Sequence, residues 1–237
     1  MRRTFLVSYP RSGQHFTGRF LGRVAGDENI YCELYTCSDK SCQADGWPIS
    51  LKSPCYAGRL LQKTHDFDLA LPQVRHFNYA VLYRRPLLSI QSYYEMELRS
   101  RNFIEISLGD RAIDKVRYKD SRLAWHSFLI QKGQYWKQFI EKWLPYCNQQ
   151  AHAKAFDYDK ITSEADELEQ VAEFCLSDFD RDKMNELIAN QKKIIEEGKF
   201  KLRSASEFRH YRESDVEQLS EIIGQRALRV AGFDSVV

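Results

Sequence analysis

The sequence predicts an α/β fold, organised as a single three-layer domain in which a central parallel β-sheet is flanked by helices. Short apolar segments alternate along the chain with longer segments of helical periodicity, which is the pattern of strand–helix–strand units. No internal repeat or low-complexity linker interrupts the 237 residues. We therefore expect one domain over residues 1–237.

Four segments have the short apolar pattern of strands: Thr4–Tyr9, 59–65, 78–84 and 151–159. The helical pattern covers 13–25, 86–101, 120–143, 164–176, 180–197 and 214–231. Residues 26–58 lack a regular pattern and predict a long loop, and loops of that length are often functional.

Composition limits the classes of function. Hydrophobic residues make up 43% of the chain and charged residues 29%, as in ordinary soluble proteins. The net charge of +2 is too small to indicate general nucleic-acid binding, so an anion site would have to be local. There is no run of about 18 apolar residues, and the apolar stretch before Pro10 is shorter than the roughly 7–15 residues of a signal peptide. We expect a cytoplasmic protein, and the composition predicts no oligomeric state.

Four of the six cysteines lie close together in the chain, at Cys32, Cys37, Cys42 and Cys55. Their spacing lacks the paired C-x2-C of structural zinc sites, and disulfides are rare in cytoplasmic proteins. We expect ordinary packed side chains, with a metal site or a disulfide as the alternatives.

The segment YPRSGQHF, residues 9–16, joins the first predicted strand to the first predicted helix and suits an anion. Gly13 allows close approach of the backbone, Ser12 adds a hydroxyl, and Arg11 adds a charged donor fork. The helix N-terminus adds unpaired N–H groups at the strand end, where ligands of parallel sheets bind. The segment does not match G-x-x-x-x-G-K-[ST], which disfavours a nucleoside-triphosphate kinase. A strand-to-helix turn without a ligand is the alternative.

A second predicted strand ends in Arg84 and Arg85, and a helix follows from Pro86. Ser92 lies eight residues after Arg84, about two helical turns along. Arg84 and Ser92 can therefore converge on one phosphate. The alternative is a surface arginine pair beside an amphipathic helix.

A third predicted strand ends in Lys63, Thr64, His65 and Asp66. Histidine is the side chain that exchanges a proton near neutral pH, so His65 is a candidate general base. The alternative is a structural or surface histidine.

Together these segments resemble the sulfotransferases that use 3′-phosphoadenosine 5′-phosphosulfate (PAPS). YPRSG before a helix, KTH after a strand and RRPLLSIQSYY are similar to the family patterns YP[KR]SGTTW, KTH and R-[ND]-P-x-D-x-x-x-S-Y-Y. The resemblance covers residues 5–94 and continues weakly through AFDYDKITSEADELEQVAEFC. It implies a P-loop-like α/β fold, PAPS as cofactor, 3′-phosphoadenosine 5′-phosphate (PAP) as product, and no required metal.

The resemblance implies that the first loop binds the 5′-phosphosulfate end of the cofactor. The backbone N–H groups of Ser12, Gly13, Gln14 and His15 would hold the 5′-phosphate, and Phe16 would stack on the adenine. Gln14 and His15 stand where the family usually has threonines, and Phe16 stands where it usually has tryptophan.

The resemblance also implies a site for the 3′-phosphate, formed by Arg84 and Ser92. The family closes over this phosphate with an Arg-Lys-Gly segment, for which KLRSASEFRHYRESD is the counterpart here. Arg203 would supply the charge, and Phe208 with Arg209 would stand for a Trp-Lys pair. The glycines are missing, so a lid of different shape is the alternative.

For catalysis, the resemblance implies direct sulfuryl transfer, with His65 as general base for the acceptor. Arg11 stands where many members have lysine and would stabilise charge on the bridging oxygen. Lys63 would assist at the sulfuryl oxygens, and Asp66 would orient His65 or act as a reserve base.

Two rival functions remain open beside the sulfotransferase. One is a non-Walker nucleotide-binding phosphotransferase, for which Asp66 and Asp68 are candidates to hold magnesium. The other is a catalytically inactive nucleotide-binding module of the same fold. The acceptor pocket is expected from residues 26–58 and 95–120. The polar and charged residues of 95–120 favour a hydroxyl-rich small molecule such as a carbohydrate over a flat steroid.

Overall fold

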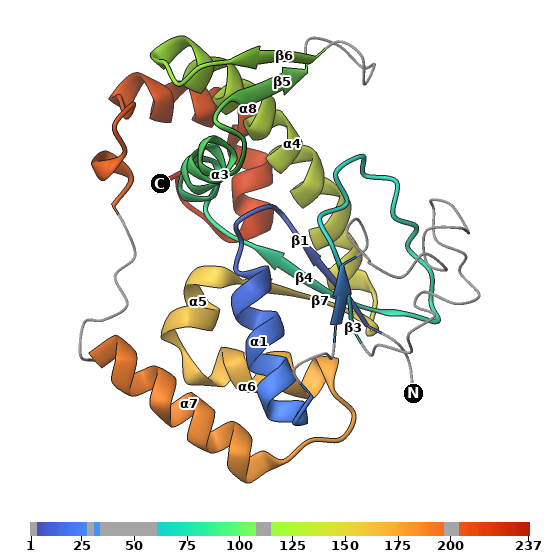
Figure 1. Ribbon diagram of the computed structural model, residues 1–237. Coiled ribbons are helices and arrows are strands. Elements are labelled where there is room, and N and C mark those ends of the chain that lie inside the picture. Colours follow the sequence, from blue (N-terminus) through green and yellow to red (C-terminus); the bar gives the residue numbers. More distant parts are fainter. Residues whose placement is uncertain (1–3, 28–30, 34–60, 108–114, 197–203) are drawn as a thin grey trace. The chain divides into compact units, whose positions relative to one another are not determined.

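The computed structural model describes residues 4–27, 31–33, 61–107, 115–196 and 204–237 (Figure 1). The chain forms two compact units. The first unit is built from Met1–Tyr83 and Tyr146–Lys201, and the second from Arg84–Pro145 and Leu202–Val237. That residues 1–237 make up one domain stays a prediction.

The first unit is built on a parallel sheet of the order β2-β3-β1-β4-β7. The strands are β1 (Thr4–Ser8), β2 (Tyr31–Glu33), β3 (Leu61–Thr64), β4 (Asn78–Tyr83) and β7 (Ala153–Asp157). Val7 pairs with Thr64 and Ser8 with Leu82, so β1, β3 and β4 end side by side. The predicted α/β class with a central parallel sheet flanked by helices is confirmed, although β2 lies within the stretch that the sequence predicts as a loop.

Among the described residues, the helices of the first unit are α1 (Gln14–Ala25), α5 (Tyr158–Ser163), α6 (Ala165–Cys175) and α7 (Arg181–Glu196). The stripe Phe20, Leu21 and Val24 gives α1 its buried face. Gly26 ends α1 in the left-handed region with φ 70°, and its N–H donates to the Arg23 carbonyl at 3.2 Å. α5 is absent from the sequence prediction, which extends the preceding strand to residue 159.

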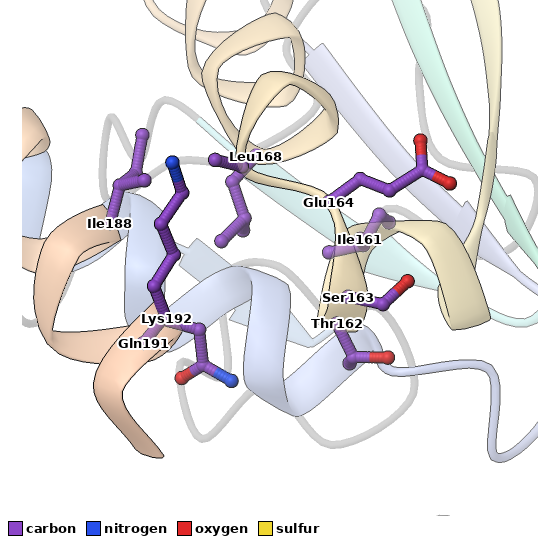
Figure 2. Close-up of a pocket in the computed structure, with 9 residues that line it drawn as sticks. Ile161, Thr162, Ser163, Glu164, Leu168, Ile188, Gln191 and Lys192 are labelled. Carbon is purple, nitrogen blue, oxygen red and sulfur yellow. The ribbon is translucent and has the colours of Figure 1, made fainter. Parts of the chain in front are cut away.

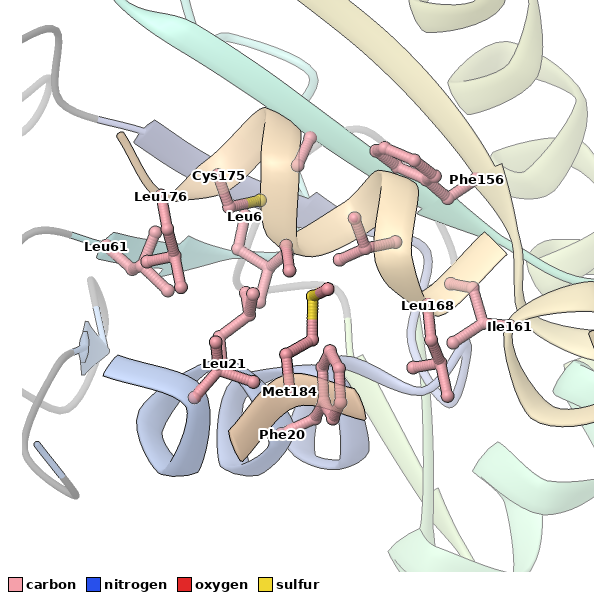
Figure 3. Close-up of a cluster of buried hydrophobic side chains, with 14 of the residues drawn as sticks. Leu6, Phe20, Leu21, Leu61, Phe156, Ile161, Leu168, Cys175, Leu176 and Met184 are labelled. Carbon is pink, nitrogen blue, oxygen red and sulfur yellow. The ribbon is translucent and has the colours of Figure 1, made fainter. Parts of the chain in front are cut away.

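One face of this sheet is covered by α1, α6 and α7. Leu6 of β1 packs in one buried cluster with Leu21 of α1, Leu168 of α6 and Met184 of α7 (Figure 3). Burial of these side chains ties the helices to the sheet, because removing apolar surface from water is the main favourable term in folding.

The other face of the sheet carries aromatic rings. Phe5 stacks on Tyr79 with centroids 5.6 Å apart, and Tyr146 meets Tyr79 edge-on at 5.8 Å. The Tyr79 hydroxyl donates to the Pro72 carbonyl at 2.7 Å, which satisfies the polar end of this buried ring.

The second unit contains α3 (Pro86–Arg101), the antiparallel ribbon β5 (Ile104–Ser107) and β6 (Lys115–Tyr118), the 3-10 turn Ala205–Glu207 and α8 (Glu213–Ala231). The long helix α4 (Arg122–Gln149) lies mostly in this unit, and its last four residues belong to the first. The ribbon is missing from the sequence prediction because its strands are only four residues long and β6 has no buried position. Among the described residues, no helix is long and apolar enough to cross a membrane.

A buried carboxylate anchors α8 to α4. Asp215, 1% exposed, accepts from the Trp125 indole at 3.0 Å and pairs with the Arg122 guanidinium. Phe208 packs its ring 4.5 Å from Trp125 in the same region. These contacts fix the segment before α8 against α4 inside the second unit.

We expect Leu168→Ala to lower the free energy of unfolding by about 2–5 kcal/mol, because it leaves a cavity in the cluster beneath the sheet. Leu168 is 2% exposed, whereas Leu123 is 65% exposed and loses the same atoms in Leu123→Ala. Urea unfolding should place Leu123→Ala within about 0.5 kcal/mol of the parent. Equal losses in the two variants would contradict this description of the core.

Candidate functional site

The turn between β1 and α1 is held in an unusual backbone conformation. The Tyr9 N–H extends the β1–β4 pairing by donating to the Leu82 carbonyl at 3.1 Å, and the Ser12 N–H closes the turn on the Tyr9 carbonyl at 3.2 Å. Arg11 has φ 66° and Gly13 has φ 82°, both left-handed. For a non-glycine residue this costs about 1–3 kcal/mol and persists only where the surroundings enforce it, often at a functional site.

This turn leads directly into the N-terminus of α1. The Thr17 N–H donates to the Gly13 carbonyl at 2.9 Å, which is the first bond of the helix. The preceding N–H groups of the first turn have no carbonyl within the helix to accept them. Together with the positive end of the helix dipole and the left-handed residues before it, they form a concave donor set that suits a phosphate or sulfate.

The Ser12 hydroxyl is a second, independent indication of a ligand. Ser12 is fully buried, and its Oγ has no hydrogen-bond partner among the residues that the structure describes. A buried hydroxyl without a partner costs about 1–3 kcal/mol. An anion at the helix N-terminus would offer the oxygen that this hydroxyl lacks.

Position 13 needs a glycine for two reasons, its positive φ angle and the close approach of the Tyr158 ring. A Cβ at this position would lie 2.0 Å from Cδ2 of Tyr158, the first residue of α5. Phe16 meets the Tyr158 ring edge-on with centroids 6.5 Å apart. The segment after β7 therefore packs directly against the turn and against the residue predicted to stack on adenine.

Gln14 fixes the helix start to the sheet. Its side-chain Nε2 donates to the Leu6 carbonyl at 2.8 Å and to the Thr64 carbonyl at 3.0 Å, so one amide bridges the middle of β1 and the last residue of β3. The side chain is 3% exposed. This leaves the backbone N–H as the group through which Gln14 would contact a phosphate.

Lys63 and His15 meet next to this helix start. The Lys63 Nζ lies 3.3 Å from Nε2 and 3.4 Å from Nδ1 of His15, joining the end of β3 to the first turn of α1. Lys63 is 4% exposed, whereas His15 is exposed to solvent. The structure thus brings two predicted site residues together and adds a positive charge to the donor set.

His65 is oriented by the last residue of β1. Its Nδ1 lies 3.0 Å from both the backbone carbonyl oxygen and the Oγ of Ser8. Because a carbonyl can only accept, we assign the proton of the neutral ring to Nδ1, and Nε2 then carries the lone pair. Ser8 is not among the site residues predicted from the sequence. The one feature that could have indicated its contact with His65 is its place at the end of β1, which pairs with the strand that carries Lys63 and Thr64.

Asp66 holds the loop after β3, and its predicted roles in orienting His65 or acting as a reserve base stay predictions. Its Oδ1 accepts from the Leu71 N–H at 2.7 Å, and its own N–H donates to the Thr64 hydroxyl at 3.1 Å. The residue is fully buried with φ 50°. The carboxylate holds the loop after β3, and the bonds to His65 Nδ1 come from Ser8.

The remaining predicted residues belong to the second unit. Arg84 follows β4 directly, is 9% exposed, and accepts from the Trp136 indole through its backbone carbonyl at 3.0 Å. Ser92 is half-buried on α3. The neighbouring Arg85 directs its guanidinium to the C-terminal residue, where it donates to the Val237 carbonyl at 2.8 Å. That Arg84 and Ser92 share one phosphate stays a prediction.

Phe208 and Arg209, the predicted stand-ins for a Trp-Lys pair, have partners inside the second unit. Phe208 is buried against Trp125, and Arg209 pairs with Asp120 at 2.8 Å. Burial raises the pKa of Asp120, but hydrogen bonds from His210 and Tyr94 and the charge of Arg209 outweigh it and hold that pKa below its usual range. Arg203 lies outside the described residues, as do Cys37, Cys42, Cys55 and the side chain of Cys32.

A separate pocket between α5, α6 and α7 is too small to be an alternative nucleotide site. Its walls combine apolar Leu168 and Ile188 with the polar groups of Glu164, Gln191 and Lys192 (Figure 2). Its volume of about 10 Å³ leaves room for roughly one water molecule. No nucleotide fits there.

No protein-family model matches the sequence, and no curated protein matches it. Solved structures do match the fold. A crystal structure of mouse sulfotransferase SULT7A1 complexed with PAP aligns with a TM-score of 0.61 and 14% identity, covering 98% of this chain and 89% of that one. Retinol dehydratase in a complex with retinol and PAP aligns with a TM-score of 0.58 and 14% identity, covering 99% and 83%. The chain therefore has the fold of these proteins.

We expect Gly13→Ala to destabilise the protein more than Gly232→Ala does. Both glycines have positive φ, 82° and 75°, but a Cβ at Gly232 meets nothing within 4 Å. Gly232→Ala thus reports the backbone strain alone, about 1–2 kcal/mol, and Gly13→Ala adds the collision with Tyr158. Thermal unfolding measures both, and equal losses would show that Tyr158 does not press on the turn.

Proposed function

We propose that this protein is a sulfotransferase, which moves a sulfuryl group from PAPS to a hydroxyl of a small-molecule acceptor. One observation carries the proposal: the strained turn after β1 leads into the first-turn donors of α1 and holds the buried, unpartnered Ser12 hydroxyl beside them. Lys63 contacts the same helix turn through His15, and His65 lies in the same unit. The likeness of the fold to PAP complexes of sulfotransferases supports it.

The donor set fits the 5′-phosphosulfate end of the cofactor. The backbone N–H groups of Gly13, Gln14 and His15 would bind the 5′-phosphate. The Ser12 N–H is bonded to the Tyr9 carbonyl, so Ser12 would contribute its hydroxyl instead, which would donate to a phosphate oxygen. Phe16 would stack on the adenine, held from its edge by Tyr158. When bound, PAPS supplies an activated sulfuryl group, and no Walker-type lysine or magnesium is needed to hold it.

His65 would act as the general base. With Nδ1–H held by Ser8, the Nε2 lone pair can take the acceptor proton while the acceptor oxygen bonds to sulfur and the bond from sulfur to the phosphate oxygen breaks. The imidazolium that forms stays bonded to the Ser8 carbonyl, whose partial negative charge stabilises it. Ser8 thereby fixes both the tautomer and the direction of the ring.

Positive charge near the helix start would stabilise the departing phosphate. Lys63 is almost completely buried, and a buried cation acts on developing charge with little screening by water. Its contact with His15 directs the ammonium group toward the first turn of α1. Arg11 would add a second cation from the turn itself.

The 3′-phosphate would be bound by Arg84 and Ser92, with Arg203 as a third contact. This part of the proposal rests on the resemblance of RRPLLSIQSYY to the family pattern. We also propose a carbohydrate acceptor and a cytoplasmic location.

We expect PAP to bind without magnesium, and 5′-AMP to bind about 10- to 100-fold more weakly, because it lacks the phosphate that Arg84 would contact. In Arg84→Ala, PAP affinity should fall to near that of 5′-AMP, while AMP affinity changes little. Arg85→Ala is the matched control, since that guanidinium is directed to Val237. Calorimetric titration measures all of these, and tight ATP binding that requires magnesium would instead indicate the phosphotransferase.

We expect His65→Ala to lower turnover by about 10²- to 10⁴-fold, the range typical of losing a general base, with PAP affinity unchanged. His76→Ala is the control, because His76 is exposed and packs on Phe77 instead of on Ser8. The assay follows sulfate transfer from labelled PAPS to a panel of sugars, phenols and peptides. Full activity in His65→Ala would remove this residue from the mechanism, and PAP binding without any turnover in the parent would indicate the inactive module.

A further inference from the structure

The loop after β3 exposes an aromatic ring beside the proposed base. Phe67 is 45% exposed, and its ring centroid lies 5.1 Å from that of His65. Within the described part of the chain, Phe67 and Leu123 are the exposed large hydrophobic residues. A single exposed apolar side chain is ordinary on a protein surface, so exposure alone would carry little weight.

The loop that carries Phe67 is held firmly by hydrogen bonds. Asp66 accepts from the Leu71 N–H at 2.7 Å through its carboxylate and from the Leu69 N–H at 2.9 Å through its carbonyl. Asp66 and Leu69 both have positive φ, 50° and 56°. Two non-glycine residues in this region within four positions mean that the loop is strained, and such strain persists mainly where function requires a set geometry.

The strained loop determines how far the Phe67 side chain, which lies between Asp66 and Leu69, is exposed. Leu71, at the end of the loop, is 5% exposed and lies in the core, whereas the larger Phe67 side chain near the start of the loop is 45% exposed. The bonds made by Asp66 therefore favour presentation of the ring over its burial. A ring held at a fixed place next to a catalytic histidine is suited to bind the molecule on which the histidine acts.

We propose that Phe67 is the platform on which the acceptor stacks, and that the acceptor is a hydroxyl borne on a ring with an apolar face. This inference rests on the sulfotransferase function and names the substrate class for that site. One face of the acceptor ring would cover Phe67, and the reacting hydroxyl would then be directed to His65. The side chain of Asp68, exposed one residue further on, binds the Ala70 N–H through Oδ1 at 3.1 Å.

Two classes of acceptor carry a hydroxyl on a ring with an apolar face, namely pyranoses and phenols. Asp68 favours the pyranose, because its carboxylate can accept from a second hydroxyl that a simple phenol lacks. Methyl β-D-glucopyranoside and 2-naphthol serve as probes for the two classes. 1-Hexanol, which has a hydroxyl but no ring, is the acyclic control.

The test compares Phe67→Ala, Phe67→Tyr and Leu123→Ala with the parent. We expect Phe67→Ala to raise the acceptor KM about 10-fold with the ring probe that the parent uses, while kcat changes little and PAP affinity by calorimetry stays the same. Phe67→Tyr keeps the ring and should restore the parent KM. Leu123→Ala removes the other exposed apolar side chain and should change neither constant.

The outcomes separate this inference from the function on which it rests. If the parent binds PAP but accepts 1-hexanol as well as either ring, or transfers to neither ring, the ring-acceptor inference is overturned and PAP recognition stands. An unchanged KM in Phe67→Ala overturns it too, as does a loss of PAP affinity equal to the rise in KM, which would mark Phe67 as structural. If the parent does not bind PAP, the sulfotransferase function fails first.

Discussion

The candidate site depends on a bridge made by one buried amide. Gln14 donates to the Leu6 and Thr64 carbonyls and thereby ties the first residue of α1 to two neighbouring strands, to the middle of β1 and to the last residue of β3. Without this tie, the helix could rotate or withdraw from the sheet, and the first-turn N–H groups would no longer lie beside Lys63. The bridge also offsets the cost of the left-handed conformation at Arg11, because a fixed helix start and a fixed strand end leave the turn little alternative.

The same bridge links the predicted phosphate site to the predicted base. Gln14 binds the carbonyl of Thr64, and Thr64 lies between Lys63 and His65 in the chain. The Thr64 hydroxyl accepts from the Asp66 N–H, which begins the strained loop that presents Phe67. The donor set, Lys63, the proposed base and the exposed ring are therefore joined through one network of hydrogen bonds that starts from β1 and β3. Preorganisation of this kind stabilises charge in a transition state without a reorganisation cost.

The sequence predicted the strands well, because β1, β3, β4 and β7 are short apolar runs that end at proline or at polar residues. It missed the β5–β6 ribbon and α5, whose segments are too short to show a period. The roles of Lys63 and His65 in the site stay predictions, as do those of Asp66 in orienting His65 or acting as a reserve base. The contact of Ser8 with His65 was not predicted. The partners of Gln14 and His65 lie 50 and 57 residues away in the chain, and no local pattern reports contacts of that range.

The central claim is that the first turn of α1 binds the 5′-phosphate of the cofactor. The most direct measurement is the change in amide ¹H and ¹⁵N chemical shifts when PAP is added to the labelled protein. We expect the amides of Gly13, Gln14 and His15 to shift the most within the first unit, with their protons moving downfield as they donate to phosphate. Binding of PAP that leaves these amides unmoved and shifts residues elsewhere would contradict it.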